Sequence, residues 1–140
     1  MSTQLLEARR VFEVAPFIRD LGCQLIALDD GFCESRIALE TRHQQQDGFV
    51  HAGVQATLAD HTAGTAAVTL ISEGELVLTA EFKINLLRAA KGRYLLCRSQ
   101  VLKPGRSLSV VESEVFVERD DGQQVLVSKA TVTLAVLQST

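Results

Sequence analysis

Residues 43–66 of the chain read HQQQDGFVHAGVQATLADHTAGTA. The first half of this stretch is polar and punctuated by glycine, and it runs directly into a helix of small residues. Such a loop leaves free backbone N–H groups at the start of the helix. Asp60 then lies within an otherwise apolar helix, where an ionised carboxylate is costly to bury without a partner or a task. This combination indicates acyl chemistry.

The composition is that of one compact domain, which we expect to span residues 1–140. Hydrophobic residues make up 46% of the chain and charged residues 22%, which is enough apolar material for a sizeable core. The net charge of -3 and the pI near 5.6 argue against binding to phosphate backbones. An aromatic content of 5% leaves few platforms for base stacking. We therefore expect no nucleic-acid partner.

The chain carries no pattern typical of secretion or of a membrane span. Residues 1–10 lack an uninterrupted apolar run and a small-residue cleavage site. The long apolar stretch at 52–71 contains Gln55, Asp60 and His61, so a buried helix is favoured over a bilayer crossing. An odd number of cysteines without close spacing predicts neither a disulfide framework nor a zinc site. We expect a cytoplasmic protein, no membrane partner, and reduced core cysteines at Cys23, Cys33 and Cys97.

Around the central helix the chain reads mostly as strands. Residues 5–21 carry a helical stripe that we expect to end or kink near Pro16. Alternation on both sides of an Asp-Asp-Gly turn predicts a β-hairpin over 23–28 and 32–40. Four further strands are expected at 76–86, 93–103, 107–118 and 125–136. This order predicts an α+β layer arrangement in which the sheet wraps the long helix.

Two segments carry a resemblance to a known family. Residues 43–66, together with 79–90 (TAEFKINLLRAA), resemble the hotdog-fold acyl-CoA thioesterases of the phenylacetate-pathway (PaaI-like) type. In that family the loop and helix usually read Asn-x-x-Gly-x-x-His-Gly-Gly, then four residues, then Leu-x-Asp. The resemblance implies a hotdog fold, an antiparallel sheet wrapped around one long central helix. It also implies hydrolysis of a small aryl- or short- to medium-chain acyl-CoA, without a metal or other cofactor.

The resemblance also implies roles for individual residues. The carboxylate of the family falls on Asp60, and the backbone amide that polarises the thioester carbonyl falls on Ala52, where the family usually has glycine. Gln45 stands where the family usually has Asn, His51 matches the histidine of the motif, and Gly53 matches its second glycine. Alanine can replace the first glycine because only an N–H group is needed there.

A hydroxyl group that positions water in some members of the family falls on Thr79. Within residues 76–86, however, Thr79 alternates with a set of apolar residues that we expect to pack on the core. Thr79 would then reach the site only if the polar face of its strand lines a cleft at an interface. The apolar set is Leu76, Leu78, Ala80, Phe82, Ile84 and Leu86.

Thioester hydrolysis needs a base or nucleophile, and donors aimed at the oxygen that gains charge. Asp60 can attack the carbonyl carbon or take a proton from water; we favour the general base and leave the nucleophile open. The donors are the N–H of Ala52, helped by that of Gly53 and by the helix dipole.

The spacing of these groups constrains the assembly. Ala52 and Asp60 are roughly 12 Å apart along a helix axis, which is too far for one thioester carbon to meet both. Two antiparallel helices across a two-fold axis would place Ala52 of one beside Asp60 of the other. We therefore expect an obligate homodimer, with two dimers forming a tetramer.

Four basic residues near strand ends and turns are candidates for binding the phosphates of coenzyme A, namely Arg88, Lys91, Lys103 and Arg106. No metal site is expected, because His43 and His61 are not spaced as ligands with His51. Two other functions stay open: a non-catalytic acyl-CoA-binding protein, and a hydratase or dehydratase on the same fold. Asp60 argues against the first. His61 points about 100° around the helix from Asp60, which argues against the second.

Overall fold

The computed structural model of the chain describes residues 2–139. Two short helices open the chain, a hairpin follows, and a long helix then precedes four more strands. The bounds are α1 Thr3–Val14, α2 Pro16–Leu21, β1 Cys23–Asp29, β2 Phe32–Ala38, a 3₁₀ turn Thr41–His43, α3 Ala52–Val68, β3 Glu75–Leu86, β4 Tyr94–Lys103, β5 Leu108–Glu118 and β6 Gln124–Gln138.

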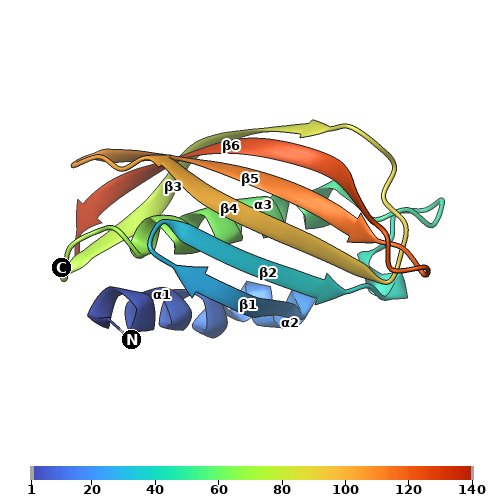
Figure 1. Cartoon of the computed structure of the whole chain (residues 1–140), viewed down its shortest axis with the longest axis horizontal. Coiled ribbons are helices and arrows are strands. Elements are labelled where there is room, and N and C mark those ends of the chain that lie inside the picture. Colours follow the sequence, from blue (N-terminus) through green and yellow to red (C-terminus); the bar gives the residue numbers. More distant parts are fainter. Residues whose placement is uncertain (1, 140) are drawn as a thin grey trace.

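The six strands form one antiparallel sheet in the order β1-β2-β4-β5-β6-β3. The sheet curves around α3, and α1 and α2 lie below its β1 edge in the view of Figure 1. This confirms the predicted arrangement of one antiparallel sheet wrapped around a long helix. The other edge of the sheet is β3, whose outer backbone groups pair with no strand among residues 2–139.

The break in the N-terminal helix lies at the predicted proline. Ala15 is extended, with φ -61° and ψ 117°, and Pro16 begins α2 at a position where a missing N–H group costs nothing. Gly22 ends α2 with a φ of 78°, the left-handed conformation that favours glycine. Phe12 and Ile18 are buried, so both helices cover the core on the side that the sheet leaves open.

Small residues let α3 lie close to the sheet. Ala59, Ala63 and Ala66 are fully buried, and short polar side chains join the two layers. The Ser113 hydroxyl donates to Ala59 O at 2.8 Å, and the Thr62 and Ser35 hydroxyls lie 2.7 Å apart. The layers are therefore held together by hydrogen bonds as well as by apolar burial.

The expected orientation of β3 is wrong in its first half. A β-bulge between Thr79 and Glu81 makes the strand exchange faces at Ala80. Before the bulge Val77 packs on the core and Leu78 is 58% exposed, whereas after it Ile84 packs on the core. Leu76 and Phe82 are also exposed, at 37% and 42%. Thr79 pairs with the buried Leu134, so it lies on the face of the sheet that is turned toward α3.

The cysteines are free, as predicted, with Cys33 and Cys97 buried and Cys23 partly buried. Burial raises the pKa of Cys23 and that of Cys97 to about 11, and it also raises the pKa of Cys33. The three thiols are therefore protonated and weakly nucleophilic at neutral pH.

No helix within residues 2–139 is both long and apolar enough to cross a membrane.

Candidate active site

Asp60 and Thr79 meet between α3 and the edge strand β3. The Thr79 hydroxyl donates to Asp60 Oδ1 at 2.6 Å, a short distance typical of a hydrogen bond to a charged acceptor. The β3 bulge makes this contact possible because it turns Thr79 toward the helix. Next to the pair is a depression of about 350 Å³, lined by Ala15, Phe17, Ile18, Ala56, Thr57, Asp60, His61 and Phe82. A carboxylate thus faces a largely apolar hollow.

The start of α3 presents one unused donor. His51 is the N-cap residue, and its Nδ1 accepts the Gly53 N–H at 2.8 Å. The next two amides, of Val54 and Gln55, both donate to His51 O. The Ala52 N–H has no acceptor among residues 2–139 and lies at the positive end of the helix dipole. Of the two predicted backbone donors, Ala52 is the free one and Gly53 is occupied.

Gln45 stabilises the loop that precedes this helix. Its Oε1 accepts the amides of Asp47 at 2.5 Å and Phe49 at 3.2 Å. Because the oxygen is taken by the loop, Nε2 is the end of the side chain that remains for a ligand. Gln45 and Ala52 share a second depression of about 310 Å³, whose lining is Gln45, Phe49, Val50, Ala52, Gln55, Leu86, Arg88, Ala89 and Ala90.

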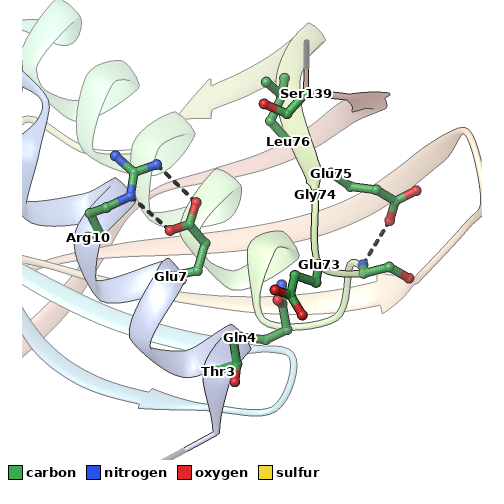
Figure 2. Close-up of a pocket in the computed structure, with 10 residues that line it drawn as sticks. Thr3, Gln4, Glu7, Arg10, Glu73, Gly74, Glu75, Leu76 and Ser139 are labelled. Atoms are coloured by element: carbon green, nitrogen blue, oxygen red, sulfur yellow. Dashed lines mark hydrogen bonds and ion pairs between the residues drawn. The ribbon is translucent and has the colours of Figure 1, made fainter.

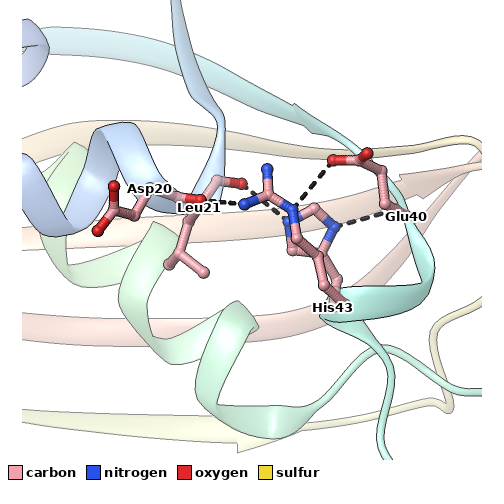
Figure 3. A network of polar contacts seen from close by, with 5 residues as sticks. Asp20, Leu21, Glu40 and His43 are labelled. Carbon is pink, nitrogen blue, oxygen red and sulfur yellow. Dashed lines mark hydrogen bonds and ion pairs between the residues drawn. The ribbon is translucent and has the colours of Figure 1, made fainter.

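His43 anchors the same loop through both nitrogens of its ring (Figure 3). Its ring is 1% exposed; Nδ1 accepts the Glu40 N–H at 3.0 Å and Nε2 donates to Leu21 O at 2.8 Å. This pattern requires a neutral ring with the proton on Nε2. His43 O also accepts the His51 N–H at 2.9 Å, so one buried residue joins the end of α2 to the cap of α3.

His61 is next to Asp60 in the sequence but is engaged elsewhere. Its Nε2 donates to Phe12 O at 3.1 Å, and its ring packs on Phe12 with centroids 4.9 Å apart. Burial lowers the pKa of His61 below its ordinary value of 6.5. His61 is therefore a neutral contact between α3 and α1, which does not favour the proton transfer that a hydratase would require.

The four predicted basic residues fall into two separate pairs. Arg88 lines the depression that contains Ala52, and its Nη1 donates to Leu126 O at 3.0 Å. Lys91 Nζ lies 6.0 Å from the ring centroid of Phe49, on the rim of the same region. Lys103 ends the ten-residue strand β4 and Arg106 follows in the next turn, at the opposite end of that strand from Lys91. Within one chain, only Arg88 and Lys91 accompany the helix start.

A third depression lies away from all predicted site residues, at the junction of α1 with the start of β3 (Figure 2). Several of its polar groups are paired: Arg10 donates to both carboxylate oxygens of Glu7 at 2.8 and 2.9 Å, and Glu75 accepts the Ser72 N–H at 2.7 Å. The Arg10 hydrogen bond lowers the pKa of Glu7. No group of three or more His, Cys, Asp or Glu suited to a metal ion occurs within residues 2–139.

Sequence reasoning missed two buried polar side chains, one on α3 and one on β6. Gln55 is 3% exposed and Ser128 is fully buried, and both Gln55 Oε1 and Ser128 Oγ lack a hydrogen-bond partner among the described residues. Gln55 could have been found, because it shares the helix face of Leu58, Ala59 and Thr62 and so had to be buried. Nothing in the sequence distinguishes Ser128 from the other polar residues of its strand.

Comparisons with known proteins show the family and the fold of the chain. A family model described as the thioesterase superfamily matches residues 47–123, which is more than half of the chain. A solved thioesterase family protein from Silicibacter pomeroyi is 34% identical, with a TM-score of 0.94 over 97% of this chain and 99% of that one. The PaaI protein from the phenylacetic acid degradation operon of E. coli has the same fold, with a TM-score of 0.83 at 19% identity over 99% and 97% of the chains.

Among characterised sequences, a 1,4-dihydroxy-2-naphthoyl-CoA hydrolase from Listeria monocytogenes is 23% identical over 81% of this chain and 91% of its own length. The matched family segment contains α3, β3 and the loop before α3 from residue 47 onward. It therefore includes Ala52, Asp60 and Thr79, as well as the loop amides that donate to Gln45. The chain therefore belongs to the thioesterase superfamily and is a thioester hydrolase with the hotdog fold.

Proposed function

We propose that this enzyme hydrolyses the thioester of a small aryl- or short- to medium-chain acyl-CoA to the free acid and coenzyme A. The observation that carries the proposal is the hydrogen bond from Thr79 to Asp60 beside an apolar hollow. The unused N–H of Ala52 and the basic pair Arg88 and Lys91 supply the other two features that such a substrate needs. The name of the Listeria relative, a hydrolase of an aryl-CoA, supports the same substrate class.

The site is completed by a second copy of the chain. Ala52 and Asp60 lie in the same uninterrupted helix and line different depressions, so roughly 12 Å of helix separates them. Two copies related by a two-fold axis bring Asp60 of one to Ala52 of the other, and the free edge of β3 is suited to pair with its own copy. We propose a homodimer with two equivalent sites, and a tetramer formed by two such dimers.

In this arrangement Thr79 holds Asp60 Oδ1 and leaves Oδ2 to face the substrate. Asp60 takes a proton from a water molecule whose oxygen attacks the thioester carbon. The carbonyl oxygen gains negative charge, which the Ala52 N–H of the partner subunit and the dipole of its helix stabilise. The C–S bond then breaks, the proton passes to the leaving sulfur, and acid and thiol are released. Direct attack by Asp60, through a mixed anhydride, is the alternative first step.

The remaining site residues have supporting roles in the proposal. His51 fixes the first turn of α3 through Gly53, and Gln45 offers Nε2 to the carbonyl oxygen. Arg88 and Lys91 bind the phosphates of coenzyme A. Lys103 and Arg106 could reach the same ligand only from the partner subunit. No cofactor is needed beyond the coenzyme A that the substrate itself carries.

The test is a steady-state panel of acyl-CoAs, monitored by release of free thiol, with the wild type and Asp60→Asn. We expect kcat to fall by several orders of magnitude, because the variant has neither a base nor a nucleophile at this position, as seen for other essential catalytic groups. Asp120→Asn, an exposed carboxylate in the turn before β6, is the matched control and should be unaffected. Near-normal turnover by Asp60→Asn on the best substrate would refute the role of this residue.

A further inference from the structure

The buried polar side chains between α3 and the sheet are paired, with two exceptions. Ser35 pairs with Thr62, Ser99 pairs with Ser113 at 2.7 Å, and the Thr69 hydroxyl both accepts from Gly31 N and donates to Ala66 O. Within residues 2–139, the sealed side-chain atoms that lack a partner are Gln55 Oε1 and Ser128 Oγ. Each such group weakens the fold unless something binds to it.

One of the two unpaired groups belongs to the wall of a depression, and the other lies on the strand beside that wall. Gln55 lines the hollow that contains Ala52 and Arg88. Ser128 on β6 is directly opposite Leu86 of β3, and Leu86 lines the same hollow. The rest of that wall is largely apolar, with Val50, Phe49 and Ala90 beside it. Gln55 is therefore a buried polar side chain in a largely apolar part of the wall.

We infer that the side-chain amide of Gln55 forms a hydrogen-bonding subsite for an amide group of the pantetheine arm of coenzyme A. This inference rests on the function proposed above. The hollow extends from Ala52, where the thioester carbonyl lies, to Arg88, where the phosphates lie, and the arm that joins these two parts of the ligand carries amide groups. A side-chain amide suits this ligand because a half-turn about its last bond exchanges acceptor and donor.

The same hydrogen-bonding chemistry could come from a hydroxyl group on the acyl portion. We assign the subsite to the arm because Gln55 shares its hollow with Arg88, whereas Asp60 lines a different one. Gln55 is thus a positioning residue: it fixes where the arm lies, and through the arm it fixes where the carbonyl meets the Ala52 N–H.

The test measures binding of S-benzyl-CoA, a thioether that cannot be hydrolysed, by isothermal titration calorimetry. Gln55→Leu keeps the volume and removes the amide, so we expect an affinity about tenfold weaker, the loss typical of one hydrogen bond. The melting temperature should not fall, because the oxygen that is removed had no partner in the protein. Gln138→Leu, at the far end of β6, is the matched control and should bind normally.

Two further ligands identify the source of the hydrogen bond. S-benzyl-pantetheine, which lacks the nucleotide, should lose the same factor with Gln55→Leu, while Arg88→Gln should weaken only S-benzyl-CoA. A loss confined to S-(4-hydroxybenzyl)-CoA would place the acyl group at Gln55 and overturn the assignment. Unchanged affinity of Gln55→Leu for all three ligands would also overturn it and make the glutamine a structural residue. Because binding is measured without turnover, a wild type that binds S-benzyl-CoA but hydrolyses no acyl-CoA would refute the proposed function alone.

Discussion

The two halves of α3 meet the sheet in different ways. From Ala59 onward, buried polar groups are paired: Ser113 holds Ala59 O, Thr62 holds Ser35, and Thr69 accepts the Gly31 N–H at 2.7 Å. Before Ala59, the Ala52 N–H and the Gln55 Oε1 have no partner among residues 2–139. The same helix thus combines an anchored half with a half whose polar groups are left open.

The difference shows how stability and function are divided within one element. The anchored half fixes the position of α3 on the sheet, so the open half can keep unpaired groups without the helix moving to satisfy them. Preorganised donors of this kind stabilise developing charge because they need no reorganisation during the reaction. Asp60 lies at the border of the two halves, where Thr79 holds it from the edge strand.

Among the changes that compare the two halves of α3, removal of the open donor should have the largest effect. Ala52 is the first residue of α3, where proline is well tolerated, and His51 before it has φ -61° and ψ 138°, which suits a residue before proline. Ala52→Pro therefore deletes the N–H with little change in the fold. We expect kcat to fall by roughly 10²–10³, as for other oxyanion donors, measured by thiol release. Ala52→Ser, which keeps the N–H, is the control and should retain activity.

Mixing this variant with Asp60→Asn tests the subunit arrangement. Neither homodimer has an intact site, but a mixed dimer formed after joint refolding combines a wild-type Asp60 from one chain with a wild-type Ala52 from the other. Activity should therefore reappear on mixing. A mixture that stays inactive although mixed dimers have formed, or a folded and active monomer in light scattering, would contradict the proposed dimer.

The border between the halves can be tested at Thr79. Thr79→Val keeps the shape but removes the hydroxyl that donates to Asp60 Oδ1 at 2.6 Å. A hydrogen bond to a charged group contributes about 1.5–3 kcal/mol, so we expect kcat/KM to fall roughly 10- to 100-fold. Thr79→Ser retains the hydroxyl and should stay within a few-fold of the wild type. Equal losses in the two variants would show that Thr79 acts through packing.

A paired hydroxyl in the anchored half and the unpaired hydroxyl on β6 should respond in opposite ways to removal. Thr62→Val leaves the buried Ser35 hydroxyl without its partner at 2.7 Å, so urea unfolding should show a loss of about 1–3 kcal/mol. Ser128→Ala removes a hydroxyl that has no partner, so the free energy of unfolding should stay level or rise. Ser35→Ala combined with Thr62→Val should recover most of the loss. Similar destabilisation by Thr62→Val and Ser128→Ala would remove the contrast between paired and unpaired buried hydroxyls.

Much of this arrangement could be predicted from the sequence, because the pattern of apolar residues follows the period of each element. The break at Pro16, the hairpin around Gly31 and the long helix beginning near Ala52 were all indicated in this way. Asp60 was singled out because a carboxylate in an apolar helix is costly, and the structure gives it a partner in Thr79.

The parts that could not be predicted depend on contacts between distant segments. The alternation of residues 76–86 fits one regular strand as well as it fits a bulged strand. Only the pairing with β6 shows that a bulge turns Thr79 inward. Ser128 looks like any strand residue, because its lack of a partner depends on what lies above it. His43 was excluded as a metal ligand from spacing, but its contact with Leu21 O required the fold itself.

The smallest effect concerns pH and tests the contact between α1 and the middle of α3. Burial lowers the pKa of His61 below 6.5, so the unfolded chain binds a proton more readily than the folded one. The stability that the neutral ring contributes is therefore complete above pH 6.5 and is lost as the pH falls through the lowered pKa. His61→Gln keeps a donor for Phe12 O but does not titrate, so the free energy of unfolding of the wild type should fall more than that of the variant between about pH 8 and about pH 5. Parallel pH profiles for the two proteins would contradict this prediction. They would show that the imidazole has the same protonation state in the folded and the unfolded chain, or gains a proton without cost. This end of the anchored half would then not be sensitive to protonation.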